Sequence, residues 1–487
     1  MAQVILIGST IGNLACAARL SIKGHSVTVL EASNSWAPDL GQVSYEDFVF
    51  DVGRTFLTLP AIFRDLFLKT GSQIEDHMEL VEDNISTRFH FQDGATLVLP
   101  GVGIGASAAA VAEAFGHQAG TEWKSFMAHA GRMWSSMRQS IIESTPPNLA
   151  QLLSHPTSVS QLRDLSIHKS YERFINGYFS DPHTVRLAQY FSTRVGSDPR
   201  SAPASLAIHP YLEQTFGIQH INGGVRRLAD AIYQRCVSLG VAFHFSTTVT
   251  SVLRHNSQFD VSTSTGSHFT SEYVVIDSQS LDCSTMSVFD SLQSSSQLHP
   301  SHSEFVLLIA LSGKTPGIEH HNVWFGESLN QEFGVINKSA RAIAEDPDIY
   351  ACVPNDRKMH PHDGEAWSIR VRASLHNPAD GINWDNADII AGASETVLAT
   401  LARRGMDLRH RISWSEVRTP ADFGRSSGNR TGALWGHAHR GRFSFLQRQP
   451  NVSTVPGLYI LGVSAHPGPT LPFVAIGANI VAQEINS

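Results

Sequence analysis

The N-terminal segment of the chain, residues 1–31, constrains the fold more than any other part. Val4–Ile7 is a short apolar run rich in β-branched residues, which predicts a strand that is buried on both faces. A turn over Gly8–Asn13 leads into Leu14–Ile22, where the apolar residues have helical spacing. Ser26–Leu30 predicts a second strand, closed by Glu31. This order is a β-α-β unit, so we expect an α/β fold with a parallel sheet.

The turn in this unit resembles the glycine turn of dinucleotide-binding proteins. In such a turn the first glycine allows a tight bend, the second lets the backbone approach a pyrophosphate, and the third allows close packing. Gly8 takes the first position, but Thr10 stands at the second and Asn13 at the third. Glu31 is correctly placed to bind ribose hydroxyls. The β-α-β unit and its ribose carboxylate are therefore present, while the phosphate-binding turn is altered. The alternative interpretation is that this unit has only a structural role and binds no dinucleotide.

Composition narrows the functional classes. The chain has 487 residues, which suits two domains. Its net charge of −8 argues against nucleic acid as a partner. The chain has four cysteines, which are Cys16, Cys236, Cys283 and Cys352. They are widely spaced and form no CxxC pair, so we expect neither a disulfide framework nor a structural zinc site, and a reducing cytoplasm fits this pattern.

The sequence predicts no membrane-spanning segment. The apolar start ends at Gly8 and no positively charged region precedes it, so a secretory signal is not expected. No apolar run reaches the roughly 18 residues that a spanning helix needs. We expect a cytoplasmic protein, with peripheral contact to the inner face of the cell membrane left open.

Beyond the first unit, helical and β segments alternate in blocks. Gly120–Glu143 and Val159–Phe191 have helical spacing, with a break expected at Pro182. Residues 240–280 and 305–309 have β character, and Ser284–Ser303 has the composition of a surface loop. A second strand and glycine-rich turn, Gly457–Gly462, precedes a terminal helix over Phe473–Ile485. We therefore expect a nucleotide domain assembled from both ends of the chain.

Read along its whole length, the chain resembles the bacterial-type phytoene desaturases, which are carotenoid desaturases of the FAD-dependent amine oxidase and phytoene desaturase superfamily. The resemblance rests on Phe48–Gly53, Gly196–Pro199, Asn222–Leu228, Thr248–Thr250, His320–Phe325, Ile349–Pro354 and, most strongly, Gly457–Gly468 with Leu471-Pro472. It implies a Rossmann-like FAD-binding domain with an inserted α+β substrate domain. We assign residues 1–90, 220–300 and 415–487 to the first domain, and 91–219 and 301–414 to the second.

The resemblance also implies which residues contact FAD. They are Gly8, Ser9, Thr10, Ile11, Gly12, Asn13, Glu31, Ala32, Arg54, Val249, Gly462, Val463, His466, Pro467, Gly468 and Leu471. The chain departs from the family around the diphosphate. Besides Thr10 and Asn13, the glycine pair and arginine expected after Glu31 are replaced by Trp36–Gly41, where Asp39 adds negative charge. These departures argue against ordinary FAD binding at this point, and replacing Thr10 and Asn13 with glycine is predicted to raise FAD affinity.

No catalytic residue is identified by the sequence, although three are weak candidates. His466 lies within the C-terminal signature, where flavin contact is the functional interpretation and a backbone-held turn residue is the alternative. Asp181 and Arg186 could act as acid and anion partner, but a solvated helix face explains them as well. Two histidine pairs, His360 with His362 and His437 with His439, lie in polar, loop-like segments. We interpret them as solvated loop residues, so no metal is expected.

Several aromatic residues of the supposed substrate domain have two interpretations. Trp134, Phe174, Tyr178, Tyr190 and Phe191 could line a tunnel for a polyene. Ordinary core packing explains them equally well.

Two main hypotheses of function follow. The first is an FAD-dependent oxidoreductase that abstracts a hydride from a long apolar isoprenoid, such as a carotenoid, with peripheral membrane contact. The second keeps the fold but loses the flavin, giving an isomerase, cyclase or hydratase, or a non-catalytic partner of an active paralogue. An amine or amino-acid oxidase is a third. The exact substrate, electron acceptor and oligomeric state are not given by the sequence.

Overall fold

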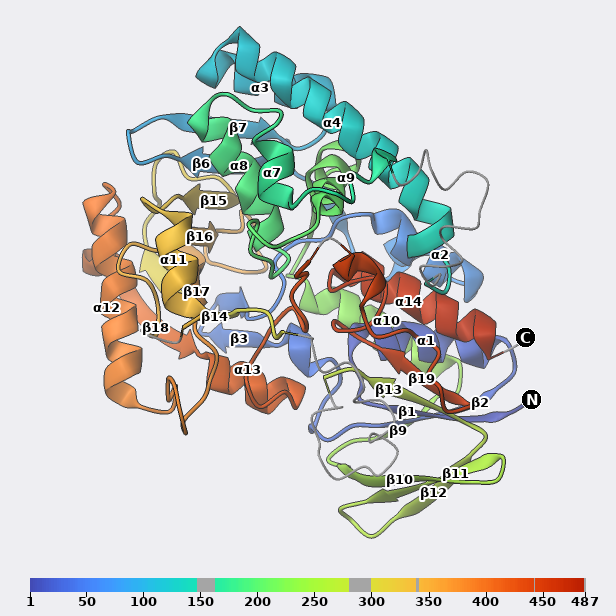
Figure 1. Cartoon of the computed structure of the whole chain (residues 1–487). Helices are drawn as coiled ribbons and strands as arrows, with labels where there is room; N and C mark the ends of the chain where they lie inside the picture. Colours follow the sequence, from blue (N-terminus) through green and yellow to red (C-terminus); the bar gives the residue numbers. More distant parts are fainter. Residues whose placement is uncertain (147–162, 280–298, 339–340, 442, 486–487) are drawn as a thin grey trace.

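A computed structural model describes residues 1–146, 163–279, 299–338, 341–441 and 443–485 (Figure 1). Its first sheet has five parallel strands in the order β19 (Leu458–Leu461), β13 (Tyr273–Asp277), β1 (Gln3–Ile7), β2 (Ser26–Leu30) and β9 (Ala242–His244). Strands from both ends of the chain therefore share one sheet, as predicted. Figure 1 shows the two termini close together beside it.

Helices and a small sheet cover the two faces of this first sheet. On one face lie α1 (Ile11–Ile22), α10 (Arg226–Ser238) and α14 (Leu471–Glu484), together with α2 (Pro60–Lys69). The other face packs against an antiparallel sheet of β10 (Val249–His255), β11 (Gln258–Thr263) and β12 (His268–Ser271) through a shared apolar cluster. Because both faces are covered, β1, β13 and β19 are apolar over most of their length rather than alternating.

The second sheet has seven strands. Their order is β18 (Ile412–Arg418), β14 (Ser303–Ser312), β17 (Gly364–Ala373), β16 (Ile349–Cys352), β15 (His321–Trp324), β6 (Ile85–His90) and β7 (Thr96–Pro100). One face packs against α12 (Ala387–Arg403), with α11 (Leu329–Ile336) nearby (Figure 1). The other face packs against β4 (Phe48–Asp51), which pairs with β3 (Gln42–Tyr45), and against α13 (Pro420–Ser427).

Two predicted domain boundaries need correction. β6 was placed in the nucleotide segment 1–90, but it pairs with β15 in the second sheet. β18 continues to Arg418, beyond the predicted boundary at 414. A period-two pattern identifies a strand but not its partner, so the sequence did not show which sheet each strand joins.

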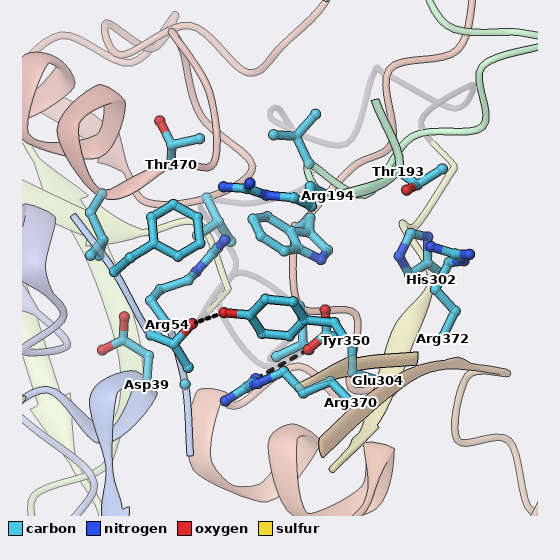
Figure 2. A pocket seen from close by; sticks show the side chains of 18 of the residues that line it. Asp39, Arg54, Thr193, Arg194, His302, Glu304, Tyr350, Arg370, Arg372 and Thr470 are labelled. Atoms are coloured by element: carbon cyan, nitrogen blue, oxygen red, sulfur yellow. Dashed lines mark hydrogen bonds and ion pairs between the residues drawn. The ribbon is translucent and has the colours of Figure 1, made fainter. Parts of the chain in front are cut away.

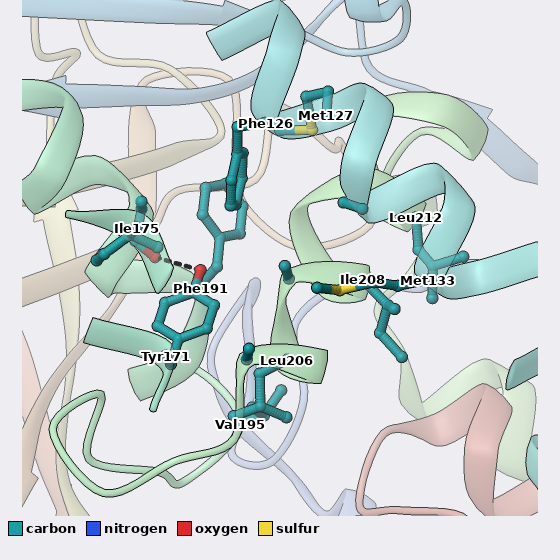
Figure 3. Close-up of a cluster of buried hydrophobic side chains, with 14 of the residues drawn as sticks. Phe126, Met127, Met133, Tyr171, Ile175, Phe191, Val195, Leu206, Ile208 and Leu212 are labelled. Carbon is teal, nitrogen blue, oxygen red and sulfur yellow. Dashed lines mark hydrogen bonds between the residues drawn. The ribbon is translucent and has the colours of Figure 1, made fainter. Parts of the chain in front are cut away.

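A helical layer covers the second sheet near β6 and β7. It consists of α3 (Ile104–Phe115), α4 (His117–Met137) with a π turn over Arg138–Ile142, α7 (Tyr171–Ile175), α8 (Pro182–Thr193) and α9 (Ile208–Phe216). Figure 3 shows the side chains that join these helices, among them Phe126, Tyr171 and Phe191. The predicted helix break at Pro182 is confirmed, because α8 begins there. Part of the predicted helix Val159–Phe191 and most of the predicted surface loop Ser284–Ser303 lie outside the described residues.

Two further short strands, β5 (Leu80–Glu82) and β8 (Gln219–Ile221), pair with each other and tie the segment after α2 to the segment before α10.

Within the described part of the chain, no helix combines the length and apolar character that crossing a bilayer requires.

Candidate flavin and substrate site

A cavity of about 200 Å³ lies where the carboxyl edge of the first sheet meets the second sheet and the helical layer (Figure 2). The segment after β4 contributes Arg54, and the end of α8 contributes Tyr190 and Arg194. The turn before α14 contributes Thr470 and Leu471. Ligands of open parallel sheets bind at the carboxyl ends of the strands, so this cavity is the candidate site.

Arginines line much of this cavity, and most are paired with carboxylates. Arg194 lies 2.8 Å from Glu213, and Arg370 lies 3.2 Å from Glu304. Arg372 forms ion pairs with two carboxylates, those of Glu332 and Asp348. These pairs compensate buried charge and give the cavity polar walls among apolar ones.

Arg54 is the exception among the cavity arginines. The described residues give it no ion pair; its guanidinium lies 3.5 Å from the Trp435 ring centre and donates to the Pro469 carbonyl oxygen at 3.0 Å. Burial lowers the pKa of Arg54 to about 10, so it stays charged at neutral pH. Arg54 therefore offers positive charge to a ligand in the cavity.

The altered phosphate loop is filled by its own side chains. Gly8 has a φ of +89°, which suits the tight turn. The Asn13 side-chain amide donates to the carbonyl oxygens of Ile7 and Gly8, both at 2.8 Å. The Thr10 hydroxyl donates to Asp277 Oδ2 at 2.7 Å. The positions that lost glycine thus hold the turn together through side-chain hydrogen bonds.

Glu31 is buried at the end of β2, as the ribose assignment requires. Its Oε2 accepts hydrogen bonds from both the N–H and the hydroxyl of Ser9, each at 2.7 Å, and its Oε1 accepts the N–H of Ser33 at 2.7 Å. The carboxylate therefore supports the phosphate loop and keeps only part of its accepting capacity for a ribose.

Two aspartates add negative charge beside the same loop. Asp277 ends β13 and is 2% exposed; its pKa is raised to about 7, chiefly by burial and also by Asp39 and Glu31. Asp39 lies in the segment whose Ala37 N–H donates to the Ser9 carbonyl oxygen, and burial raises its pKa to about 6. Asp39 Oδ1 is buried without a hydrogen-bond partner. The loop thus faces carboxyl groups where a diphosphate needs positive or neutral ones.

The C-terminal turn fits a tightly packed cofactor site. Gly462 has a φ of +101°, and a Cβ there would lie 2.5 Å from Asp277 Oδ2, so only glycine is accommodated. Val463 and Leu471, two of the residues expected to contact FAD, line the cavity. Pro467 and Gly468 lie in the same turn, before α14 begins.

His466 does not line the cavity. It is 2% exposed, and its Nε2 lies 2.7 Å from the Ile141 carbonyl oxygen and 3.1 Å from that of Ser144. These contacts match the structural interpretation, in which the backbone holds the ring.

The structure assigns other roles to Asp181 and Arg186. The Asp181 side chain accepts the N–H groups of His183 and Thr184, which makes it the N-cap of α8. Arg186 forms an ion pair with Asp348 and its side chain is 14% exposed, so the solvated-face interpretation is wrong for it. Neither residue lines the cavity.

The remaining sequence assignments are distributed around the first sheet and the cavity. Val249 begins β10 and is buried against the first sheet, while Ala32 is exposed after β2. Of the aromatic candidates, Tyr190 and Phe191 line the cavity, whereas Trp134 and Phe174 pack in the helical layer. Tyr178 is packed against that same layer.

The solvated interpretation of the two spaced histidine pairs is partly wrong. His360 is 2% exposed and His439 is 6% exposed, and the Arg448 guanidinium contacts His439 Nε2 at 3.2 Å. Only His362 is fully on the surface.

Sequence reasoning missed Asp277 and the paired arginines of the cavity. One signal was present for Asp277, because the strand over Tyr273–Asp277 ends on a carboxylate and the carboxyl ends of parallel strands meet at one edge. The arginines of β17, Arg370 and Arg372, are separated from their partners along the chain, so no local pattern marks them.

We expect Thr10→Gly to tighten FAD binding by about tenfold, which corresponds to roughly 1.4 kcal/mol. The substitution removes the Thr10 side chain, which hydrogen-bonds to Asp277, from the helix N-terminus where a phosphate would lie. The double change with Asn13→Gly is expected to cost stability, because the Asn13 amide bonds to Ile7 and Gly8 are lost. Fluorescence titration with FAD, together with thermal melts of both variants, checks this; equal affinity of Thr10→Gly and the natural chain would contradict it.

Comparison with known proteins places this geometry in context. The family described as flavin containing amine oxidoreductase matches residues 14–278. The chain is 25% identical to 4,4'-diapolycopene oxygenase of Methylomonas sp, covering 99% of this chain and 98% of the relative. It is 25% identical to 1-hydroxycarotenoid 3,4-desaturase of Flavobacterium sp. (strain P99-3), covering 100% of this chain and 99% of the relative.

Solved structures show the same fold at lower identity. Putrescine oxidase bound to putrescine superimposes with a TM-score of 0.67 at 14% identity, covering 100% of this chain and 99% of that one. Cyclohexylamine oxidase from Brevibacterium oxydans IH-35A superimposes with a TM-score of 0.64 at 13% identity, covering all of both chains. The predicted α/β fold, with its parallel sheet and additional substrate-domain sheet, is confirmed.

Proposed function

Because the chain belongs to the flavin containing amine oxidoreductase family, we propose that it is an FAD-dependent oxidoreductase that acts on a long apolar isoprenoid of the carotenoid type. The observation that carries the proposal is the match, over nearly the full length of each chain, to enzymes named as carotenoid desaturases and oxygenases. The cavity between the two sheets supports it, because it lies beside the C-terminal turn that the family closes over its flavin.

The residues of the candidate site suit the ring and ribose ends of FAD better than its diphosphate. Val463, Leu471 and the N-terminal end of α14 would hold the ring end, and Glu31 would hold the ribose. The N-terminus of α1 points toward the diphosphate position, but Asp277 and Asp39 repel a diphosphate when they are ionised. FAD therefore fits this chain when these carboxyl groups are neutral.

The chemistry divides between the cofactor and the chain. When bound, the flavin supplies the acceptor for a hydride from a substrate carbon. The chain contributes apolar walls, such as Phe191 and Leu212, which exclude water from the reacting carbon. Arg54 would bind an oxygen atom at one end of the isoprenoid, because it is the cavity arginine without an ion pair in the described structure.

Peripheral contact with the membrane is part of the proposal, because a carotenoid is dissolved in the bilayer. Val102 is 42% exposed and Phe216 is 40% exposed, and the Gly217 Cβ position lies 3.1 Å from Val102 Cγ2. These two exposed apolar residues are therefore near one another at the edge of the helical layer. Co-sedimentation with phospholipid vesicles tests the contact, and loss of binding in Phe216→Ser is the supporting result.

The function is tested by a spectrum followed by a substrate assay. The purified chain, saturated with FAD at pH 6, is expected to show flavin absorption bands that dithionite bleaches. Mixed without oxygen with acyclic carotenoids in vesicles, it should lose the oxidised flavin band as the polyene spectrum shifts to longer wavelength. A chain that binds FAD but shows neither change with hydrocarbon or hydroxylated carotenoids would exclude this substrate class.

A further inference from the structure

Three potential metal donors meet at one edge of the strand pair β15–β16. His321 in β15 is paired in register with Cys352 in β16, and His320 precedes β15. One donor atom from each of these three residues lies within 4.8 Å of the others. His320 and His321 stack face to face with ring centres 4.3 Å apart and ring planes at 18°, so one ring has to turn for both to reach a single ion. The pairing of two strands thus brings together residues that are distant in sequence.

Each histidine of this cluster has a polar group beside its Nδ1. His320 Nδ1 lies 3.1 Å from Asp83 Oδ2, and His321 Nδ1 lies 2.8 Å from the Tyr350 hydroxyl. In metal sites, a ligating histidine uses its other ring nitrogen in this way, on a carboxylate, carbonyl or other polar group. The outer contact is a hydrogen bond for His321, whereas Asp83 lies close to His320 without forming one.

The nitrogens that face the other way are left without partners. His320 Nε2 and His321 Nε2 are both buried and neither has a hydrogen bond. The His320 side chain is 8% exposed and His321 is 1% exposed. Burying two unsatisfied ring nitrogens side by side costs free energy, and a bound cation would satisfy both.

Cys352 completes the donor set as a free thiol that is 3% exposed. A small cavity of about 10 Å³ lies against it and is also lined by His220, Asp51 and Thr55. A cavity of roughly 10–15 Å³ holds one water molecule. The cavity can therefore hold one water molecule beside Cys352, although His320 and His321 do not line it.

We propose that His320, His321 and Cys352 bind a zinc ion. Two imidazoles and one thiolate suit zinc, and a fourth position open to water is typical of zinc sites with three protein ligands. Zinc–nitrogen bonds of about 2.0 Å and a zinc–sulfur bond of about 2.3 Å separate tetrahedral ligand atoms by roughly 3.3–3.6 Å, so the cluster contracts by up to about 1.5 Å on binding. On binding, the thiol of Cys352 loses its proton to solvent.

This site is separate from the phosphate loop but touches the cavity wall. The Tyr350 hydroxyl that contacts His321 also lies 2.6 Å from the Thr55 hydroxyl, and Tyr350 and Thr55 both line the large cavity. A metal ion would fix the His321 ring and, through it, the position of Tyr350. The ion is thus expected to order the cavity wall rather than to take part in hydride transfer.

Metal content and cobalt spectra of the full-length chain test the proposal without any measurement of flavin or activity. The natural chain, stripped with dipicolinate and titrated with Zn²⁺ against a chromophoric chelator, should bind one equivalent. Replacement by Co²⁺ should produce a thiolate charge-transfer band in the near ultraviolet and tetrahedral bands in the visible.

Matched variants identify the ligands. Cys352→Ser should lose the thiolate band and weaken Zn²⁺ binding at least a hundredfold, whereas Cys236→Ser, another buried free thiol, should change neither. His320→Gln provides a second test if Cys352→Ser fails to fold, as judged by circular dichroism. A folded natural chain that binds no Zn²⁺ and gives no thiolate band, or unchanged binding in folded Cys352→Ser or His320→Gln, would overturn the proposal.

Discussion

Replacing Asp277 with asparagine is expected to tighten FAD binding about thirtyfold or more at pH 8 and to change it little at pH 5. An ionised carboxylate about 4 Å from a phosphate charge costs up to about 4 kcal/mol at an effective dielectric constant of 20. Asparagine removes the charge and still hydrogen-bonds with the Thr10 hydroxyl and the Gln279 N–H, which contact Asp277 in the natural chain.

The pH dependence follows from the direction of the pKa shift. The pKa of Asp277 is raised to about 7, chiefly by burial and also by Asp39 and Glu31, while the hydrogen bonds from Thr10 and Gln279 oppose the shift. At pH 5 the group is protonated and neutral, so the diphosphate meets little repulsion from it. As the pH rises through about 7 the group ionises, and FAD affinity of the natural chain falls. Asp39, with a pKa of about 6, adds to this fall.

Calorimetric titration with FAD at pH 5, 6.5 and 8 measures the effect. Repeating it in two buffers of different ionisation enthalpy should show proton uptake on binding near pH 7 in the natural chain and less uptake in Asp277→Asn. Asp407→Asn, which changes an exposed aspartate on the second sheet's side of the molecule, is the control. Equal affinity of the natural chain at pH 5 and pH 8 would show that these carboxyl groups do not oppose FAD.

Replacing Arg372 with leucine is expected to destabilise the fold by about 3–5 kcal/mol, because breaking a buried ion pair leaves uncompensated charge. Arg372 donates to Glu332 at 2.6 Å and to Asp348 at 2.5 Å, and both carboxylates are buried. Arg186 would remain as a partner of Asp348, but Glu332 would lose its ion pair with Arg372. Because Arg372 lines the cavity, the loss also disturbs the site wall.

Urea denaturation at pH 7 measures this change in the free energy of unfolding. Arg425→Leu is a matched control, because Arg425 also contacts two carboxylates but its side chain is 60% exposed. Exposed pairs contribute about 0–1 kcal/mol, so the control should unfold near the natural midpoint. Similar midpoints for Arg372→Leu and Arg425→Leu would refute the assigned role of Arg372.

The sequence determined the parts of the fold that depend on local pattern. Strand β1, helix α1 and strand β2 follow from apolar spacing and from a glycine with positive φ, and the turn from β19 into α14 follows from the same signals. Such patterns depend on neighbours along the chain, which a sequence displays directly. The altered phosphate loop was visible for the same reason, because glycine is missing at fixed positions in a known turn.

Only the tertiary structure decided what faces that loop and what the second sheet brings together. Asp277 reaches Thr10 because β13 lies beside β1, and Cys352 reaches His321 because β16 pairs with β15. An alternating or apolar pattern marks a strand without naming its partner or register. The charge around the diphosphate position and the three-residue donor cluster depend on that pairing, so they were decided by long-range packing rather than by local sequence.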